Sequence, residues 1–246
     1  MFQKSYATLS KKGPAALFFL VAKKLADDSF NILITHVGKI AKPVFNFQSK
    51  QYNYYFHTSN STWRNERIIE IPIIWNKIAS AKNKRILELG NTINHYFNLS
   101  EYPKYVVVDK FEEGTGVINK DIVDFESSEK FDTIISISTI EHVGFDEKEG
   151  AKKLNDGKKT LRALKKIKSL LQRRGRAYIT FPIGYNSNLD TMLKKNLLGF
   201  DKTYFMERIN KKNEWKECRA EKAINKKYGE PFEFANAVVI GIIEND

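Results

Sequence analysis

Three side chains near the middle of the sequence can take part in proton transfer: those of Glu141, His142 and His95. The pKa of a histidine lies near neutrality, so its imidazole can accept a proton from an alcohol. A lone histidine more often has a structural role, but His142 stands beside an acid, just after the apolar run TIISIS. We predict His142 as the first candidate for a catalytic base and His95 as the second, with Glu141 orienting either of them.

A second set of residues can hold a ligand that contains a ribose. Asp109 follows the apolar run YVVV, and an acid at such a strand end commonly accepts hydrogen bonds from ribose hydroxyls. Asp121 follows GVINK, where it either meets the edge of an adenine or caps the next turn. Gly90 permits close approach of a ligand to the backbone, and the helix expected after it offers free N–H groups. These positions predict a ligand that carries a nucleoside.

The segment from Gly90 to His95 excludes one common class of nucleotide site. A dinucleotide-binding fingerprint has the pattern G-x-G-x-x-G at this place, whereas this chain reads GNTINH. The sequence therefore argues against a cradle for a pyrophosphate. No metal site is predicted either, because the acids and histidines lack the spacing of a chelating set.

Short apolar runs must position these residues. RILEL (85–89), YVVV (105–108) and TIISIS (133–138) are nearly continuous aliphatic runs, which are typical of parallel strands buried on both faces of a sheet. In open α/β sheets, ligands bind at the carboxyl ends of the strands, where the polar residues fall here. RAYITFP (176–182) predicts a fifth strand after a helix that Gly175 ends. KTYFMER (202–208) and NAVVIGIIE (236–244) predict a closing antiparallel pair, joined through the helix-like WKECRAEKAINKKY.

The residues before the first of these strands divide into two parts. Residues 1–60 read as an N-terminal appendage, in which a helix begins at Pro14, is broken at Asp27 and Asp28, and is followed by a shorter element and an aromatic cluster. Residues 61–246 read as the main domain. It opens with STWRNERIIEIPIIWNKIA, where Pro72 predicts a kink or two short helices. Its Asn65, Glu66 and Arg67 face either a substrate or solvent.

Composition narrows the classes of protein further. The chain has 246 residues and a formal net charge of +12, which suits an anionic partner, although scattered lysines also indicate a lysine-rich composition. Its single cysteine, Cys218, excludes an internal disulfide and a cysteine-rich metal site. The apolar run AALFFLVA (15–22) is too short to span a bilayer, for which ~20 apolar residues are needed. It is long enough for a surface-lying anchor.

Residues 84–184 resemble a class I S-adenosylmethionine-dependent methyltransferase of the methyltransferase type 11 kind. ELGN resembles the first motif of this family, although it has one glycine where two or three are usual. VVDKFE resembles the motif with the second-strand acid, and NKDIVDF resembles the motif with the acid beside the adenine. FDTIISISTIEHVG resembles the fourth-strand motif. NERIIEIP, GNTINHYF, STIEHVGFDE and FPIGYNSNLD resemble a bacterial subgroup that often accompanies cell-envelope polysaccharide genes.

The resemblance implies a Rossmann-like α/β sheet, mostly parallel with an antiparallel last strand, and S-adenosylmethionine as the cofactor. This cofactor carries no pyrophosphate and needs no three-glycine cradle. By the resemblance, the methionine part lies near Glu88 and Gly90, the ribose at Asp109, and the adenine beside Asp121 and Ile122. The full set of expected cofactor contacts is Glu88, Gly90, Asn91, Asp109, Lys110, Asp121, Ile122 and Ser138.

The acceptor is expected beside the cofactor, against Tyr96, Tyr185, Asn186 and Arg208. The predicted reaction is methyl transfer to an oxygen or nitrogen of a small molecule or saccharide, in cell-envelope glycan biosynthesis. The predicted location is the cytoplasm, with peripheral contact to the inner face of the membrane through the N-terminal segment.

Two other functions stay open. A nucleic-acid methyltransferase would suit the positive charge, but the chain has no N/D-P-P-Y/F tetrapeptide for base amines and no RNA-binding module that we identify. A protein that binds S-adenosylmethionine without catalysis would keep Asp109 and Asp121. The sequence does not indicate an oligomeric state.

Overall fold

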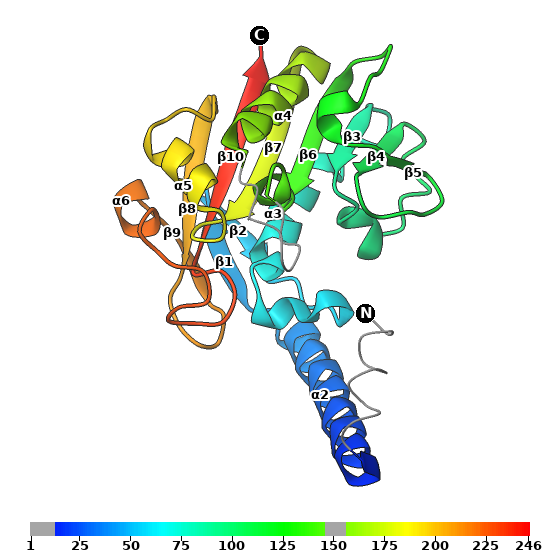
Figure 1. The fold of residues 1–246 in the computed structure, drawn as a ribbon, viewed down its shortest axis with the longest axis vertical. Helices are drawn as coiled ribbons and strands as arrows, with labels where there is room; N and C mark the ends of the chain where they lie inside the picture. The colour runs from blue at the N-terminus through cyan, green and yellow to red at the C-terminus, as the bar shows by residue number, and fades with distance from the viewer. Residues whose placement is uncertain (1–12, 146–155) are drawn as a thin grey trace.

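The computed structural model describes residues 13–145 and 156–246, and its centre is an eight-stranded sheet (Figure 1). The strands lie in the order β5-β4-β3-β6-β7-β10-β8-β9. Their bounds are β3 (Ile86–Leu89), β4 (Tyr105–Asp109), β5 (Val117–Asn119), β6 (Phe131–Ile137), β7 (Leu171–Pro182), β8 (Lys202–Arg208), β9 (Trp215–Cys218) and β10 (Ala237–Asn245).

The strand directions confirm the predicted fold class. β5, β4, β3, β6 and β7 are parallel neighbours, and β10 pairs antiparallel with both β7 and β8. This is a Rossmann-like, mostly parallel sheet with an antiparallel last strand, as predicted. β3 lies between β4 and β6, so the chain changes direction across the sheet at the carboxyl end of β3. Ligands bind outside such switch points in open α/β sheets.

Two details of the sheet differ from the prediction. Trp215–Cys218 forms the edge strand β9, antiparallel to β8, and only Ala220–Ala223 (α6) is helical in the segment predicted as a helix. The helix before β7 ends at Leu170 rather than near Gly175. Leu171 is already paired with Phe131 of β6, because burial of both side chains in the core favours the longer strand.

Helices and a hairpin cover the two faces of the sheet. On one face, α3 (Arg67–Ile78) packs with the hairpin of β1 (Val44–Phe47) and β2 (Lys50–Asn53). On the other face lie α4 (Gly157–Leu170) and α5 (Ser187–Lys194). Successive side chains of β6 alternate accordingly, with Ile134 in one core and Ile135 in the other. Four short turns of 3₁₀ helix complete the fold: η1 (Ser59–Arg64), η2 (Ile93–His95), η3 (Ile122–Asp124) and η4 (Ile140–His142).

Pro72 was expected to cause either a kink or a division into two short helices. Helix α3 runs through Pro72 as one element, so the second alternative is wrong. Proline has no N–H and leaves a carbonyl one turn earlier without its helical partner. Here the carbonyl of Ile68 accepts a hydrogen bond from the backbone N–H of Tyr55 at 2.9 Å instead. The proline therefore creates the point at which the N-terminal segment is attached to α3.

The N-terminal segment begins with α2 (Gly13–Ala41), a helix of 29 residues that projects away from the sheet (Figure 1). The predicted break at Asp27 and Asp28 is wrong, because an aspartate inside a helix costs under ~1 kcal/mol when no proline or glycine accompanies it. Neither α2 nor another helix in the described ranges is long and apolar enough to cross a membrane. Residues 1–12 of the predicted appendage lie outside the described residues.

The aromatic cluster after α2 joins the N-terminal segment to the domain. Phe45, Phe47 and Tyr52 of the β1–β2 hairpin are buried in the same core as α3, and the Phe47 ring lies edge-on to Tyr204 of β8. The hairpin thus belongs to the core of the larger domain. The domain boundary at residue 60 stays a prediction.

Candidate functional site

A cleft of about 340 Å³ opens at the carboxyl ends of β3 and β4. This volume lies within the roughly 300–1,000 Å³ of small-molecule sites. Five of the predicted site residues line it together, and the whole lining consists of Ser59, Asn60, Arg67, Gly90, Asn91, Thr92, His95, Tyr96, Asp109, Glu112 and Thr139. The structure therefore has a cleft at the end of the sheet, where the ligand was expected.

Gly90 gives the floor of the cleft its shape. Its φ of +84° is a backbone conformation that residues with a Cβ rarely adopt. A Cβ at this position would stand 2.2 Å from the Oγ1 of Thr139, which lines the same cleft. The single glycine of the first motif is therefore required both by the turn and by the close approach of Thr139.

Asp109 organises the loop that borders the cleft. Its Oδ1 accepts hydrogen bonds from the backbone N–H groups of Phe111 and Glu112, both at 2.7 Å. Among the described residues, its Oδ2 accepts one long bond, 3.3 Å, from the backbone N–H of Asn91. One carboxylate oxygen thus fixes the loop, and the other keeps capacity to accept hydrogen bonds from a ligand in the cleft.

Asn91 supplies an unused acceptor in the cleft wall. Its amide nitrogen donates to Glu112 Oε1 at 2.5 Å, while its Oδ1 is buried and has no hydrogen-bond partner among the described residues. A buried polar atom without a partner is costly, and a ligand donor at this place would remove that cost. The wall formed by Asn91, Asp109 and Glu112 therefore suits a cationic group with N–H donors.

Glu88 does not line the cleft but supports it from below. Its Oε1 accepts from the backbone N–H groups of Thr92 and Ile93, at 2.8 and 2.7 Å, and its Oε2 accepts from the Tyr105 hydroxyl at 2.9 Å. The helix expected after Gly90 is only the 3₁₀ turn η2. The expectation of free N–H groups at a helix start is therefore wrong, because Glu88 takes the first two of them.

Burial raises the pKa of Glu88 to about 7, although its hydrogen bonds to Ile93, Tyr105 and Thr92 lower that pKa. The unfolded chain loses this proton near pH 4.5, so stability falls as the pH rises from about 4.5 to 7. We predict that Glu88→Gln makes this fall shallower, by up to about 3 kcal/mol over the interval. Urea unfolding of both proteins across that pH range measures the difference. Equal pH dependence of the two proteins would contradict the raised pKa.

The predicted adenine side is occupied by ion pairs. Asp121 caps η3 through the backbone N–H of Val123 and pairs with Lys159 of α4 at 2.5 Å and with Lys110 at 3.4 Å. Burial raises the pKa of Asp121, but the two lysines and the Val123 N–H lower it more, so that it lies below its usual value. Ile122 is a core residue. None of these residues lines the cleft described above.

Ser138 directly follows β6 in a strained conformation, with φ of +40°. Its hydroxyl donates to the carboxylate of Glu70 on α3, at 2.8 Å to Oε1. This bond joins the sheet to α3, and the predicted cofactor contact of Ser138 stays a prediction.

Sequence reasoning did not identify the buried charges of α3. Glu66 and Glu70 are buried, and Arg67 between them lines the cleft and pairs with Glu70 Oε2 at 2.6 Å. Burial lowers the pKa of Arg67, but Glu70, Glu66 and Glu141 raise it, with a net upward shift. The signal in the sequence was the glutamate inside the otherwise apolar run RIIEIPII, which a solvated helix face does not explain.

The two predicted bases lie in different surroundings. His95 lines the cleft, with its Nε2 3.1 Å from Glu112 Oε1. His142 lies outside the lining, edge-on to Tyr185 at 5.0 Å between ring centroids and with its Nε2 3.9 Å from Glu141 Oε1. The Oε2 of Glu141 has no hydrogen-bond partner among the described residues, and burial raises its pKa well above the usual value.

Of the four predicted acceptor contacts, Tyr96 lines the cleft and Tyr185 packs beside His142. Asn186 is buried and caps α5 by accepting from the N–H groups of Asn188 and Leu189. Arg208 donates to the backbone carbonyls of Arg64, Glu233, Asn210 and Lys211. The polar atoms of Asn186 and Arg208 are thus used within the fold.

Within the described parts of the chain, no three histidine, cysteine or acidic side chains stand together as metal ligands would.

Comparison with known proteins gives weak similarities. No protein-family model and no curated protein sequence matches this chain. Among solved structures, the N-methyltransferase NodS from Bradyrhizobium japonicum WM9 with S-adenosyl-L-homocysteine has a TM-score of 0.47 at 12% identity, over 73% of this chain and 87% of that one. A possible histamine N-methyltransferase from Thermotoga maritima has 0.40 at 14%, over 74% and 97%. The sugar N-methyltransferase KedS8 from Streptoalloteichus has 0.33 at 15%, over 46% and 47%. The fold class rests on the strand order itself.

Proposed function

We propose that this protein is an S-adenosylmethionine-dependent methyltransferase that acts on an oxygen or nitrogen of a small molecule or saccharide. The observation that carries the proposal is the cleft at the carboxyl ends of β3 and β4, where Gly90, Asn91 and Asp109 meet. The sheet order and the sequence resemblance support the same reaction class.

The residues present fit this cofactor. Asp109 Oδ2 has capacity for ribose hydroxyls, and the unpartnered Asn91 Oδ1 suits an ammonium group. The carboxylates of Asp109 and Glu112 favour the positive charge of a sulfonium, and the Arg67 guanidinium in the same lining suits a carboxylate. The cleft has no glycine-rich cradle, and the proposed cofactor needs none. When bound, S-adenosylmethionine supplies a methyl group that a nucleophile can displace from sulfur.

The chain's own part in such a reaction is alignment, exclusion of water and removal of a proton. His95 stands in the cleft lining, and its ring nitrogen lies within hydrogen-bond distance of Glu112, which fixes the orientation of the imidazole. This placement favours His95 over His142 as the base. Tyr96, also in the lining, would contact the acceptor.

Two measurements test the proposal. Calorimetry with S-adenosyl-L-homocysteine is expected to show one site per chain, and the absence of binding would overturn the cofactor assignment.

The second measurement concerns the acceptor, because we place the activity in cell-envelope glycan biosynthesis. Mass spectrometry of envelope glycans from a deletion strain is expected to show the loss of one methyl group. Unchanged glycans would overturn that placement alone, and binding without transfer to any acceptor would favour a non-catalytic protein.

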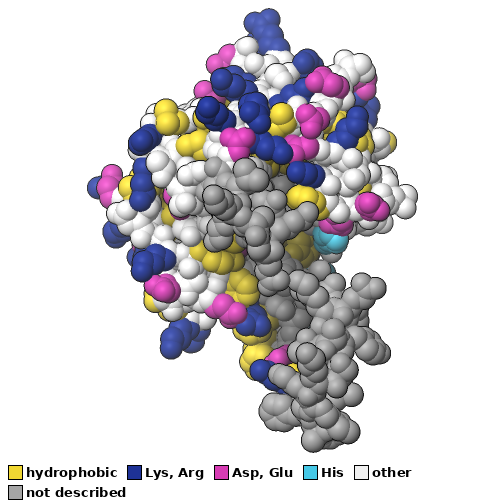
Figure 2. All heavy atoms as spheres, viewed as in Figure 1, with side chains coloured by type: hydrophobic (Ala, Val, Ile, Leu, Met, Phe, Trp, Pro, Cys, Tyr) yellow, Lys and Arg dark blue, Asp and Glu magenta, His cyan; other side chains and the backbone are white. Residues whose placement is uncertain are grey.

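The net charge of +12 favours a nucleic-acid methyltransferase as the second candidate. Among the described residues on the face shown in Figure 2, however, lysines and arginines are interspersed with acidic side chains and form no single basic patch. Affinity for RNA that falls steeply with salt would support this candidate.

We also propose peripheral contact with the inner face of the membrane through α2, in an otherwise cytoplasmic protein. Of its residues, Leu25, Ile32 and Ile40 are more than half exposed, and they lie within one broad side of the helix. An exposed apolar side of this kind is one way in which a helix binds the membrane interface. Sedimentation with anionic vesicles tests this contact, and loss of sedimentation on Leu25→Ser with Ile32→Ser is the expected result.

A further inference from the structure

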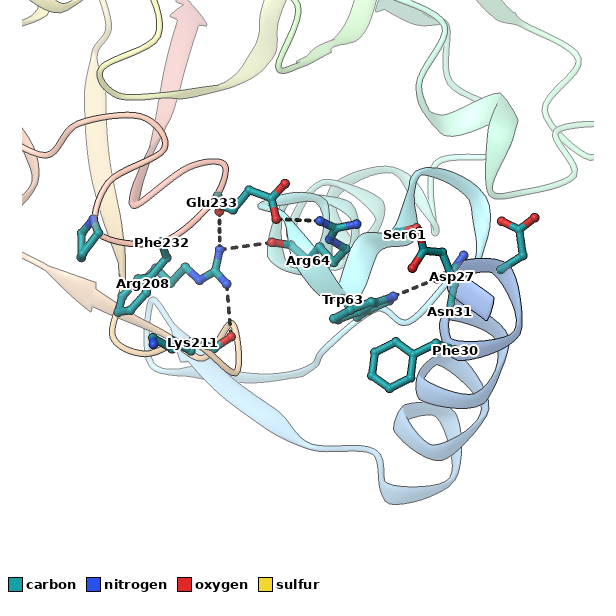
Figure 3. A pocket seen from close by; sticks show the side chains of 12 residues that line it. Asp27, Phe30, Asn31, Ser61, Trp63, Arg64, Arg208, Lys211, Phe232 and Glu233 are labelled. Carbon is teal, nitrogen blue, oxygen red and sulfur yellow. Dashed lines mark hydrogen bonds and ion pairs between the residues drawn. The ribbon is translucent and has the colours of Figure 1, made fainter. Parts of the chain in front are cut away.

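A second and larger cavity lies between α2 and the main domain (Figure 3). Its volume is about 650 Å³, almost twice that of the cleft at the ends of β3 and β4. Helix α2 supplies one wall, the η1 turn supplies the middle, and the loop before β10 supplies the other wall. No step of the proposed reaction uses this cavity.

Aromatic rings on both sides form the apolar surfaces of this cavity. Phe30 of α2 and Trp63 of η1 meet edge-on, with 5.6 Å between ring centroids. The indole N–H of Trp63 donates to Asn31 Oδ1 at 2.8 Å, which fixes the orientation of the ring (Figure 3). Phe232 lines the opposite side, with the Arg208 guanidinium 5.3 Å from its centroid. Rings fixed in this way offer flat apolar surfaces at little cost in conformational entropy.

Charged side chains balance each other across this cavity. Asp27, Asp28 and Glu233 stand against Arg64, Arg208 and Lys211, although the whole chain carries a net charge of +12. Arg64 is paired with Glu233 at 2.6 Å, and Arg208 is saturated by backbone carbonyls. The lining thus offers donors and acceptors without an excess of either charge. Such a site does not select an anion or a cation.

We propose that this cavity binds a neutral saccharide. Sugar rings present apolar C–H faces, which pack on aromatic rings, and hydroxyl groups at their edges, which donate to carboxylates and accept from ammonium groups. The cavity provides the rings of Phe30, Trp63 and Phe232, with Asp27 and Asp28 beside them. The two carboxylates would repel a phosphate or an anionic lipid headgroup, and Lys211 would repel an ammonium ligand.

The η1 turn connects this cavity to the proposed reaction site. Ser59 and Asn60 line the cleft at the end of β3, while Ser61, Trp63 and Arg64 line the second cavity. The two cavities therefore share η1 as a wall. This step rests on the proposed function: the saccharide bound in the second cavity is the part of the acceptor that lies away from the methylated atom.

The test begins with the full chain on an array of bacterial surface glycans, followed by calorimetry with the best-retained neutral oligosaccharide. We expect Trp63→Ala to weaken binding by at least about tenfold and Trp63→Phe to weaken it less. Asp27→Asn with Asp28→Asn, which leaves the core untouched, is expected to weaken it several-fold. Glu221→Ala, which removes an exposed acid of α6 outside both cavity linings, is the matched control.

Three results would overturn the proposal: no neutral glycan is retained, only anionic glycans are retained, or affinity is unchanged both in Trp63→Ala and in the double aspartate variant. Binding of S-adenosyl-L-homocysteine is measured on the same proteins and is expected to stay unchanged. The failure of the saccharide site and the failure of the proposed methyltransferase function are therefore distinguishable.

Discussion

Asp109→Ala is expected to remove measurable binding of S-adenosyl-L-homocysteine. The Oδ2 of Asp109 is the acceptor assigned to the ribose, and each hydrogen bond to a charged group contributes about 1.5–3 kcal/mol. Loss of two such bonds corresponds to an affinity decrease of at least about 100-fold. Asp109 Oδ1 also holds the loop through the N–H groups of Phe111 and Glu112, so part of the loss would arise from loop disorder.

Asp109→Asn separates these two contributions. Its remaining carbonyl oxygen can still accept from Phe111 and Glu112 and keep the loop in place, but it carries no charge and offers one acceptor fewer. We expect an affinity between those of the wild type and Asp109→Ala. Calorimetry measures all three proteins, with Glu221→Ala as the control for removing an exposed acid. Wild-type affinity in Asp109→Ala would contradict the cofactor assignment.

The sheet was predictable from the sequence because its strands are nearly continuous aliphatic runs, and the polar residues after them mark the strand ends. This located Gly90, Asn91, His95 and Asp109 in one cleft. Glu88 could not be placed in the same way. From the sequence alone, a carboxylate at a strand end suggests a ligand contact, whether its side chain points into the cleft or beneath it. Here the backbone N–H groups of Thr92 and Ile93 donate to Glu88 and hold its side chain beneath the cleft.

The role of α3 could not be predicted for a related reason. A helix pattern shows which residues share a side, but packing on the sheet determines what that side meets. The sequence left Glu66 and Arg67 facing either a substrate or solvent. In the structure the N–H of Ala235 donates to the buried Glu66, and Arg67 reaches the cleft. Likewise, two adjacent aspartates in α2 indicated a helix end, whereas the helix continues through them because nothing else interrupts it.

Glu70 carries the second large expected effect, this one on stability. Its carboxylate is fully buried, pairs with Arg67 at 2.6 Å and accepts from the Ser138 hydroxyl at 2.8 Å. Removing one partner of a buried ion pair costs about 3–5 kcal/mol, because the other charge is left buried. Glu70→Ala is therefore expected to lower the free energy of unfolding by that amount, measured by urea unfolding. A change below about 1 kcal/mol would show that the pair contributes little.

Replacing both partners separates the two causes of this loss. With Arg67→Met and Glu70→Leu together, no charge of the pair remains unpaired, and well-packed apolar pairs often replace buried ion pairs without loss of stability. We expect the double variant to be more stable than Glu70→Ala, while its cofactor binding is weaker than that of the wild type, because Arg67 lines the cleft. Recovered stability with weakened cofactor binding would mean that the buried pair of Arg67 and Glu70 serves cofactor binding rather than stability. Recovery of both would instead exclude Arg67 from cofactor binding.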